Sequence, residues 1–238
     1  MATLILTDIE KIDPLTTSRN IEIIESNVVP EQLDDNTLYI ASDEKVSLDE
    51  VTGAFDYVII GVHRVEEADA PKNVKVYFDL ENYPFFQKGK SIIQEEEQPK
   101  GVFRYRRMVN EAKGTSLLAG DLYILERLLG KAESISVQQT DPSMVPHHLI
   151  VMVNFGGGTM AHIEYTVTDR ERIEFEWSGV KNILEFDSDD MRPFKPGELT
   201  QLPLMFSADA LVENARELDE PLKDALTNYR QLLNGGAE

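Results

Sequence analysis

Short apolar runs separated by turn residues and charged clusters make up the first hundred residues. Each run has the length of a strand, is rich in Ile, Leu and Val, and is bounded by Asp, Asn, Pro or Gly, which is typical of β-strands. The run at 57–61 is almost continuously apolar, which favours a strand covered on both faces in a parallel α/β sheet. The predicted strands are residues 3–6, 21–24, 37–41 and 57–61, with 74–79 and 101–105 continuing the same sheet.

Two helices are predicted in the first 130 residues. A short one is expected to begin at Ser47, where Glu50 would complete a capping box. A longer one follows Thr115, because leucines recur at 118, 122, 125 and 129, the spacing of an apolar helix face. Gly130 supplies its C-terminal stop.

Period-two alternation replaces this pattern after Gly130. In the segment RIEFEW, Ile, Phe and Trp point to one side and the two Glu residues to the other, which indicates a strand with one buried and one wet face. The three glycines at 156–158 predict a hairpin turn. A C-terminal helical tail is expected from Ser207 as N-cap, with Pro221 as the first residue of a second helix. The strands of this antiparallel sheet, about five in number, are predicted at 134–138, 148–155, 159–168, 172–177 and 182–186.

The fold class that these elements predict is α/β followed by α+β. Residues 1–105 would form a reduced Rossmann-like parallel domain. Residues 106–238 would form a domain with a helix, an open and mostly antiparallel sheet, and C-terminal helices.

Charge narrows the possible partners of the chain. With 23 Lys and Arg against 43 Asp and Glu, the net charge is −20, which argues against binding to nucleic acid or to an anionic membrane. The chain has no cysteine, so disulfides and thiolate metal sites are excluded. No signal peptide or membrane-spanning run is recognised in the sequence, and a cytoplasmic protein is therefore expected.

One short basic stretch interrupts this acidic chain. Arg104, Arg106 and Arg107 lie on a predicted strand, where alternation places Arg107 on the face opposite the other two. Arginines are suited to bidentate capture of a carboxylate or phosphate, so a small anionic ligand is one interpretation. The alternative is that these arginines pair with the many carboxylates of the chain.

Four stretches carry a resemblance to a known family. The sequences GVFRYRRM, LLAGDLYILERLLG and LIVMVNFGGGTMAHIEYTV, followed by IEFEWSGVKNILEFD, resemble the C-terminal part of the Gfo/Idh/MocA oxidoreductases. The resemblance spans residues 101–194. It implies a Rossmann-like domain, a nicotinamide cofactor, and a homodimer formed through the open face of the antiparallel sheet.

The same resemblance identifies three losses. The family's GxGxxG turn after the first strand is absent, since no glycine precedes Gly53. The catalytic lysine of its Glu-Lys-Pro motif is replaced by Tyr83, before the retained Pro84. The histidine of its helix motif aligns with Gly120, next to Asp121. The expected function is therefore a dimeric, noncatalytic or small-anion-binding protein without a cofactor, and the alternative is an active NAD(P)-dependent oxidoreductase with an altered cofactor site.

The remaining candidates for catalysis are single residues. Asp121 could line a relict pocket or favour the N-terminal turns of its helix, and Tyr83 could substitute in proton transfer. His63 follows a predicted strand, where α/β folds bind ligands. A metal site at His147 and His148 is disfavoured, because adjacent residues of a strand point to opposite faces.

Overall fold

A computed structural model divides the chain into two compact units, Met1–Pro84 with Leu204–Ala225, and Phe85–Pro203 with Leu226–Glu238. The structure describes residues 4–7, 9, 11–13, 20–23, 37–41, 48, 58–68, 73–109, 114–141, 143–189 and 204–234. The predicted cap at Ser47 and Glu50 lies outside them.

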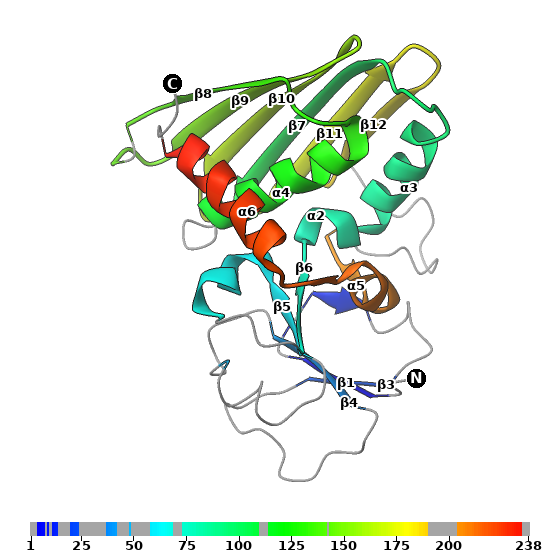
Figure 1. The fold of residues 1–238 in the computed structure, drawn as a ribbon, viewed down its shortest axis with the longest axis vertical. Helices are drawn as coiled ribbons and strands as arrows, with labels where there is room; N and C mark the ends of the chain where they lie inside the picture. The colour runs from blue at the N-terminus through cyan, green and yellow to red at the C-terminus, as the bar shows by residue number, and fades with distance from the viewer. Residues whose placement is uncertain are drawn as a thin grey trace. The chain divides into compact units, whose positions relative to one another are not determined.

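The first unit contains a six-stranded sheet in the order β14-β6-β5-β4-β1-β3 (Figure 1). The five strands from β6 to β3 are parallel, which confirms the predicted parallel α/β sheet, and β14 is antiparallel to β6. β5 is buried along its whole length, as its continuous apolar run predicts. The strands are β1 (Leu4–Thr7), β3 (Asn20–Ile23), β4 (Thr37–Ala41), β5 (Val58–Gly61), β6 (Val74–Tyr77) and β14 (Arg216–Glu217).

Shorter elements complete the first unit. The two-residue strands β2 (Ile12–Asp13) and β13 (Phe206–Ser207) pair in parallel. The helical segments are the 3-10 helix η2 (Val62–Glu67), α2 (Asp79–Asn82) and α5 (Ala208–Asn214). The Ser207 side chain accepts a hydrogen bond from the Ala210 amide at 3.4 Å, which confirms its prediction as an N-cap.

The second unit contains a six-stranded sheet in the order β12-β11-β7-β10-β9-β8, with α4 lying across one face (Figure 1). Only the pair of β7 and β10 is parallel, so the sheet is mostly antiparallel, as expected. Gly130, at φ 109°, follows the end of α4. The elements are α3 (Pro84–Ile93), β7 (Gly101–Val109), α4 (Gly114–Leu129), β8 (Ser134–Gln139), β9 (His147–Gly156), β10 (Thr159–Val167), β11 (Arg172–Gly179) and β12 (Ile183–Asp187).

The assignment of 101–105 to the parallel sheet is wrong. β7 lies in the second sheet between β10 and β11, and its inward side chains alternate with exposed ones, which suits a sheet open on one face. The edge of β6 is instead paired with β14, which comes from the C-terminal part of the chain. The predicted domain boundary after residue 105 therefore falls inside a continuous strand, and residues 204–225 return to the first unit.

The last helix, α6 (Glu220–Leu233), begins one residue earlier than predicted. The Asp219 side chain accepts a hydrogen bond from the Leu222 amide at 2.9 Å and so caps the helix. Pro221 is consequently the second helical residue rather than the first.

The apolar face of the second sheet is buried within the chain. α4 contributes a broad stripe of buried leucines to the same core. The opposite face of the sheet, where exposed side chains alternate with these buried ones, is open. The buried sheet residues are Val151, Val153, Ile163, Tyr165, Ile173, Phe175 and Trp177.

Candidate functional site

The three candidate arginines of β7 lie on two faces of the second sheet, as alternation predicts. Arg104 and Arg106 are exposed on the open face, whereas the Arg107 side chain has no exposed surface. Each has a carboxylate partner: Glu176 lies 2.6 Å from Arg104, Glu164 lies 3.0 Å from Arg106, and Asp121 lies 3.1 Å from Arg107. An anion at any of them would have to compete with that carboxylate.

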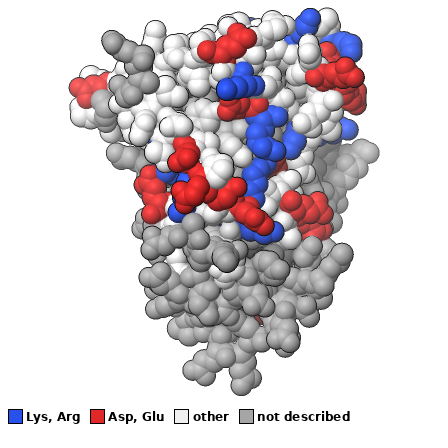
Figure 2. All heavy atoms as spheres, viewed as in Figure 1, with Lys and Arg blue, Asp and Glu red and all other residues white. Residues whose placement is uncertain are grey.

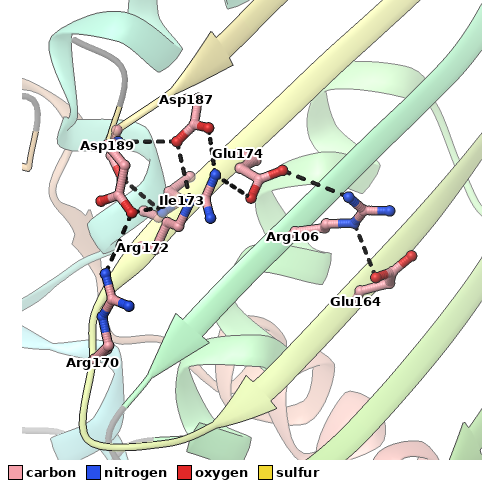
Figure 3. Close-up of polar contacts among 9 residues, drawn as sticks. Arg106, Glu164, Arg170, Arg172, Ile173, Glu174, Asp187 and Asp189 are labelled. Carbon is pink, nitrogen blue, oxygen red and sulfur yellow. Dashed lines mark hydrogen bonds and ion pairs between the residues drawn. The ribbon is translucent and has the colours of Figure 1, made fainter.

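The open face carries a charge ladder across four strands, β10, β7, β11 and β12 (Figure 3). Arg106 also approaches Glu174 at 3.6 Å, and Arg172 bridges Glu174 at 2.9 Å to Asp187 at 2.5 Å. Contact with Glu164 raises the pKa of Arg106, and contact with Arg172 lowers the pKa of Asp187. Because these pairs are largely solvated, each contributes between about 0 and 1 kcal/mol, and their main effect is to fix the charge pattern of the face. The charge ladder consists of Arg104, Arg106, Glu164, Arg172, Glu174, Glu176 and Asp187.

On the face that Figure 2 shows, acidic side chains flank a central group of basic ones. The described part of this surface therefore has no large area of a single sign. Such a surface offers little long-range attraction to a polyanion.

A buried polar cluster lies on the other face of β7, against α4. It consists of Arg107, Asp121, Tyr105 and Tyr165, none of which is more than 2% exposed. Arg107 Nη1 donates to both Asp121 oxygens, at 3.2 Å and 3.1 Å, and the Tyr105 hydroxyl donates to Asp121 Oδ2 at 2.9 Å. The Tyr165 hydroxyl donates to the same oxygen.

The electrostatics of this buried polar cluster favour a structural role. Burial raises the pKa of both phenols well above the ordinary value, so they remain neutral donors. Burial also raises the pKa of Asp121, while Arg107 opposes that shift. Asp121 is thus buried in the core, where three donor side chains from the sheet surround its carboxylate.

Tyr83 is fully buried, in the first unit. Its ring packs on Phe206 at 5.0 Å between centroids. On the preceding turn, Arg216 pairs with the buried Glu81 at 2.5 Å, and Asn214 donates to Asn82 at 3.3 Å. The stretch that resembles the family's Glu-Lys-Pro motif is therefore packed against α5 and β14.

The candidate histidines lie in three separate places. His63 follows β5 in η2, as expected, and its ring lies so close to Gly61 that a Cβ there would be 2.5 Å from Cε1. His147 contacts Thr140 at 3.1 Å, and His148 contacts Thr166 at 3.0 Å. Among the described residues, no group of three or more His, Asp or Glu side chains could hold a metal ion.

Sequence reasoning named Arg107 and Asp121 separately and missed their pairing. A signal was available, since Tyr105 and Arg107 share one face of a strand, and Asp121 comes four residues after Leu117 on the buried side of α4. The partner from β10, Tyr165, could not be assigned without the strand order.

Comparisons with known proteins identify the fold. No protein-family model matches the sequence, and no curated protein sequence matches it. The structure is similar to a myo-inositol dehydrogenase from Corynebacterium glutamicum, with a TM-score of 0.55 and 11% identity, over 98% of this chain and 94% of that chain. It is also similar to a dehydrogenase from Chromobacterium violaceum, with a TM-score of 0.55 and 11% identity, over 96% and 92% of the two chains.

A third solved structure is similar along almost the whole chain. It is GenD2 from gentamicin A biosynthesis in complex with NAD, with a TM-score of 0.52 and 10% identity, over 99% of this chain and 87% of that chain. The present chain is shorter than these proteins. It therefore has the fold of the Gfo/Idh/MocA-type dehydrogenases, in a shortened form.

Proposed function

We propose that this protein is a noncatalytic relative of the dehydrogenases whose fold it has, that it has lost dinucleotide binding and hydride transfer, and that it acts as a homodimer. The observation that carries the proposal is the course of the chain after β1. In this fold a glycine turn and a helix N-terminus bind the pyrophosphate at that point. Here the Thr7 side chain accepts a hydrogen bond from the Ile9 amide at 2.9 Å, and the next element among the described residues is the two-residue strand β2.

These residues do not fit a dinucleotide. β1 lies between β3 and β4, so its carboxyl end is the topological switch point of the sheet, where α/β proteins bind ligands. The sequence there has no glycine, and Asp8, Glu10 and Asp13 add negative charge. The negative charge of these side chains would repel a pyrophosphate.

The two positions that resemble catalytic ones support the same proposal. Tyr83 has no exposed surface, and Gly120, at the position of the family's histidine, carries no side chain that could move a proton. Asp121 is held by Arg107 and two phenols. Oxidation of a polyol by hydride transfer also needs a general base that accepts the proton of the hydroxyl group. We infer that none of these three positions supplies that base.

The open face of the second sheet supports the proposed homodimer. Ile150, Met152 and Met160 form an exposed apolar strip on β9 and β10, and each is 37–39% exposed. The charge ladder lies beside this strip and carries both signs. A two-fold related copy could therefore bury apolar side chains while matching opposite charges.

The second candidate function is an oxidoreductase with an altered cofactor site, favoured by the likeness to GenD2, which was solved with NAD.

A cytoplasmic location remains a prediction. None of the described helices is long and apolar enough to cross a membrane.

The test is an assay for hydride transfer. Purified protein would be incubated with NAD⁺ or NADP⁺ and a panel of cyclic polyols that includes myo-inositol, and absorbance at 340 nm would be followed. We expect no rate above the blank without protein, because no described group at Tyr83, Gly120 or Asp121 can transfer the hydroxyl proton. Turnover with any member of the panel would favour the second candidate.

A further inference from the structure

A cavity of about 470 Å³ lies within the second unit, bounded by the start of α4, the ends of β8, β9 and β10, and Asn234. This volume is in the range of pockets that bind small molecules. The residues that line it do not include Tyr83, Gly120 or Asp121.

Apolar side chains form much of the lining. Leu118 of α4 and Leu149 of β9 are buried, and Val167 of β10 is half-buried. Tyr165 adds an aromatic ring, and its hydroxyl is fixed by Asp121 of the buried polar cluster. Because Asp121 is itself held by Arg107, this wall is preorganised and need not be ordered when a ligand binds.

Large apolar side chains also lie in the loop between β8 and β9, which borders the cavity. Met144 is 60% exposed and Val145 is 88% exposed. Exposed side chains of this size next to a cavity are typical of a surface that a ligand covers.

The polar groups of the lining select the chemistry of the ligand. The Asp169 carboxylate is exposed, and the hydrogen bond described for it comes from Thr168 at 3.1 Å. A carboxylate only accepts hydrogen bonds, so a ligand must bring a donor to it. The net charge of −20 opposes an anionic ligand. His147 adds a ring nitrogen that can donate or accept.

We propose that this cavity binds a small molecule with an apolar body and an amino or hydroxyl group, held by Leu118, Leu149 and Tyr165 around the body and by Asp169 at the polar end. This inference is independent of the loss of hydride transfer, and it assigns a binding site whose lining does not include Tyr83, His63 or Asp121.

The test uses three probes with the same phenyl body: 2-phenylethylamine, 2-phenylethanol and phenylacetate. Binding to the full-length protein would be measured by ligand-observed saturation-transfer NMR and by calorimetry. We expect the amine and the alcohol to bind, and phenylacetate to bind at least about tenfold more weakly, because its carboxylate would face Asp169.

Two variants locate the binding. Thr115→Trp, at an exposed lining position in the first turn of α4, is expected to fill the cavity and abolish binding of all three probes. Lys88→Trp adds the same ring to an exposed site on α3 and should leave binding unchanged. Asp169→Asn should reduce the preference for the amine over the acid, whereas Asp224→Asn, on an exposed turn of α6, should preserve it.

Circular dichroism would verify that each variant is folded, since Thr115→Trp and Lys88→Trp each add a second tryptophan and their fluorescence would not report Trp177 alone. The proposal is overturned if wild-type protein binds neither the amine nor the alcohol up to about 10 mM, a level that fragments of this size reach in a formed pocket. It is equally overturned if the three probes bind alike, or if Thr115→Trp binds them as the wild type does.

Discussion

Asp121→Ala is expected to lower the free energy of unfolding of the second unit by about 3–5 kcal/mol, since it leaves a buried arginine without its close carboxylate partner. Arg107 has no exposed side-chain surface, and the carboxylate of Glu171 lies farther from it than that of Asp121, at 4.0 Å. The hydroxyls of Tyr105 and Tyr165 would lose the same acceptor. The loss combines an uncompensated charge with two buried donors.

The measurement is urea unfolding followed by fluorescence of Trp177, the only tryptophan of the chain, which is buried in the same unit. Glu176→Ala is the matched control, because it also removes a carboxylate from an arginine, but on the solvated face. It should change the free energy of unfolding by no more than about 1 kcal/mol. Equal effects of the two variants would contradict the structural role of the buried polar cluster.

A double variant tests whether the destabilisation by Asp121→Ala comes from the unpaired buried charge or from any substitution at this position. Arg107→Met combined with Asp121→Leu removes both charges and keeps apolar volume, so we expect stability to return to within about 1 kcal/mol of the wild type or above it. The hydroxyls of Tyr105 and Tyr165 would still lack acceptors, which sets the limit of this recovery. A double variant no more stable than Asp121→Ala would show that charge burial is not the cause.

Met152→Glu is expected to convert the proposed dimer into monomers. It introduces a charge into the middle of the apolar strip, opposite the same residue or a close neighbour in a two-fold interface. A desolvated, unpaired charge in an interface costs several kcal/mol, which corresponds to a weakening of association by about a thousandfold or more.

Light scattering coupled to size exclusion gives the result directly. The wild type should run at twice the chain mass of 26.9 kDa, and Met152→Glu should run at the single mass. Met144→Glu is the matched control, since Met144 is more exposed but belongs to the loop between β8 and β9 and not to the apolar strip. A wild type that is monomeric at high concentration would refute the dimer.

Local sequence patterns predicted the helices and strands better than they predicted which strands pair with one another. The leucine spacing of α4 and the alternation in β11 were sufficient, because the period of the apolar positions reports which face is buried. The hairpin turn at 156–158 could also be predicted, because three consecutive glycines favour positive φ, and all three have a positive φ in the structure.

Long-range pairings were not accessible in the same way. β7 was assigned to the wrong sheet, because its sequence fits a half-buried strand in either sheet and only the pairing with β10 and β11 decides between them. The two-residue strand β14 carries no periodic pattern at all, yet it covers the edge of β6. The Asp121 carboxylate accepts hydrogen bonds from side chains of both β7 and β10, and this too could not be predicted without the strand order.

The candidate arginines show how far the sequence alone could predict function. Their types and spacing fit both an anion site and a set of ion pairs, and the sequence favours neither without knowing which carboxylates lie opposite. The register of β7 against β10 and β11 places Glu164, Glu174 and Glu176 beside Arg104 and Arg106. Anion binding by these arginines remains a prediction that competes with those pairs.

Direct titration with reduced cofactor tests the central claim, which is that this protein does not bind a dinucleotide. NADH and NADPH would each be added to the purified full-length protein, and nicotinamide fluorescence and thermal shift would be followed together. We predict no saturable change up to millimolar concentration, because the sequence after β1 has no glycine before Gly53 and its next described element is the strand β2, whereas pyrophosphate binding needs a glycine turn and a helix N-terminus. Saturable binding of either cofactor in the micromolar range would contradict the account.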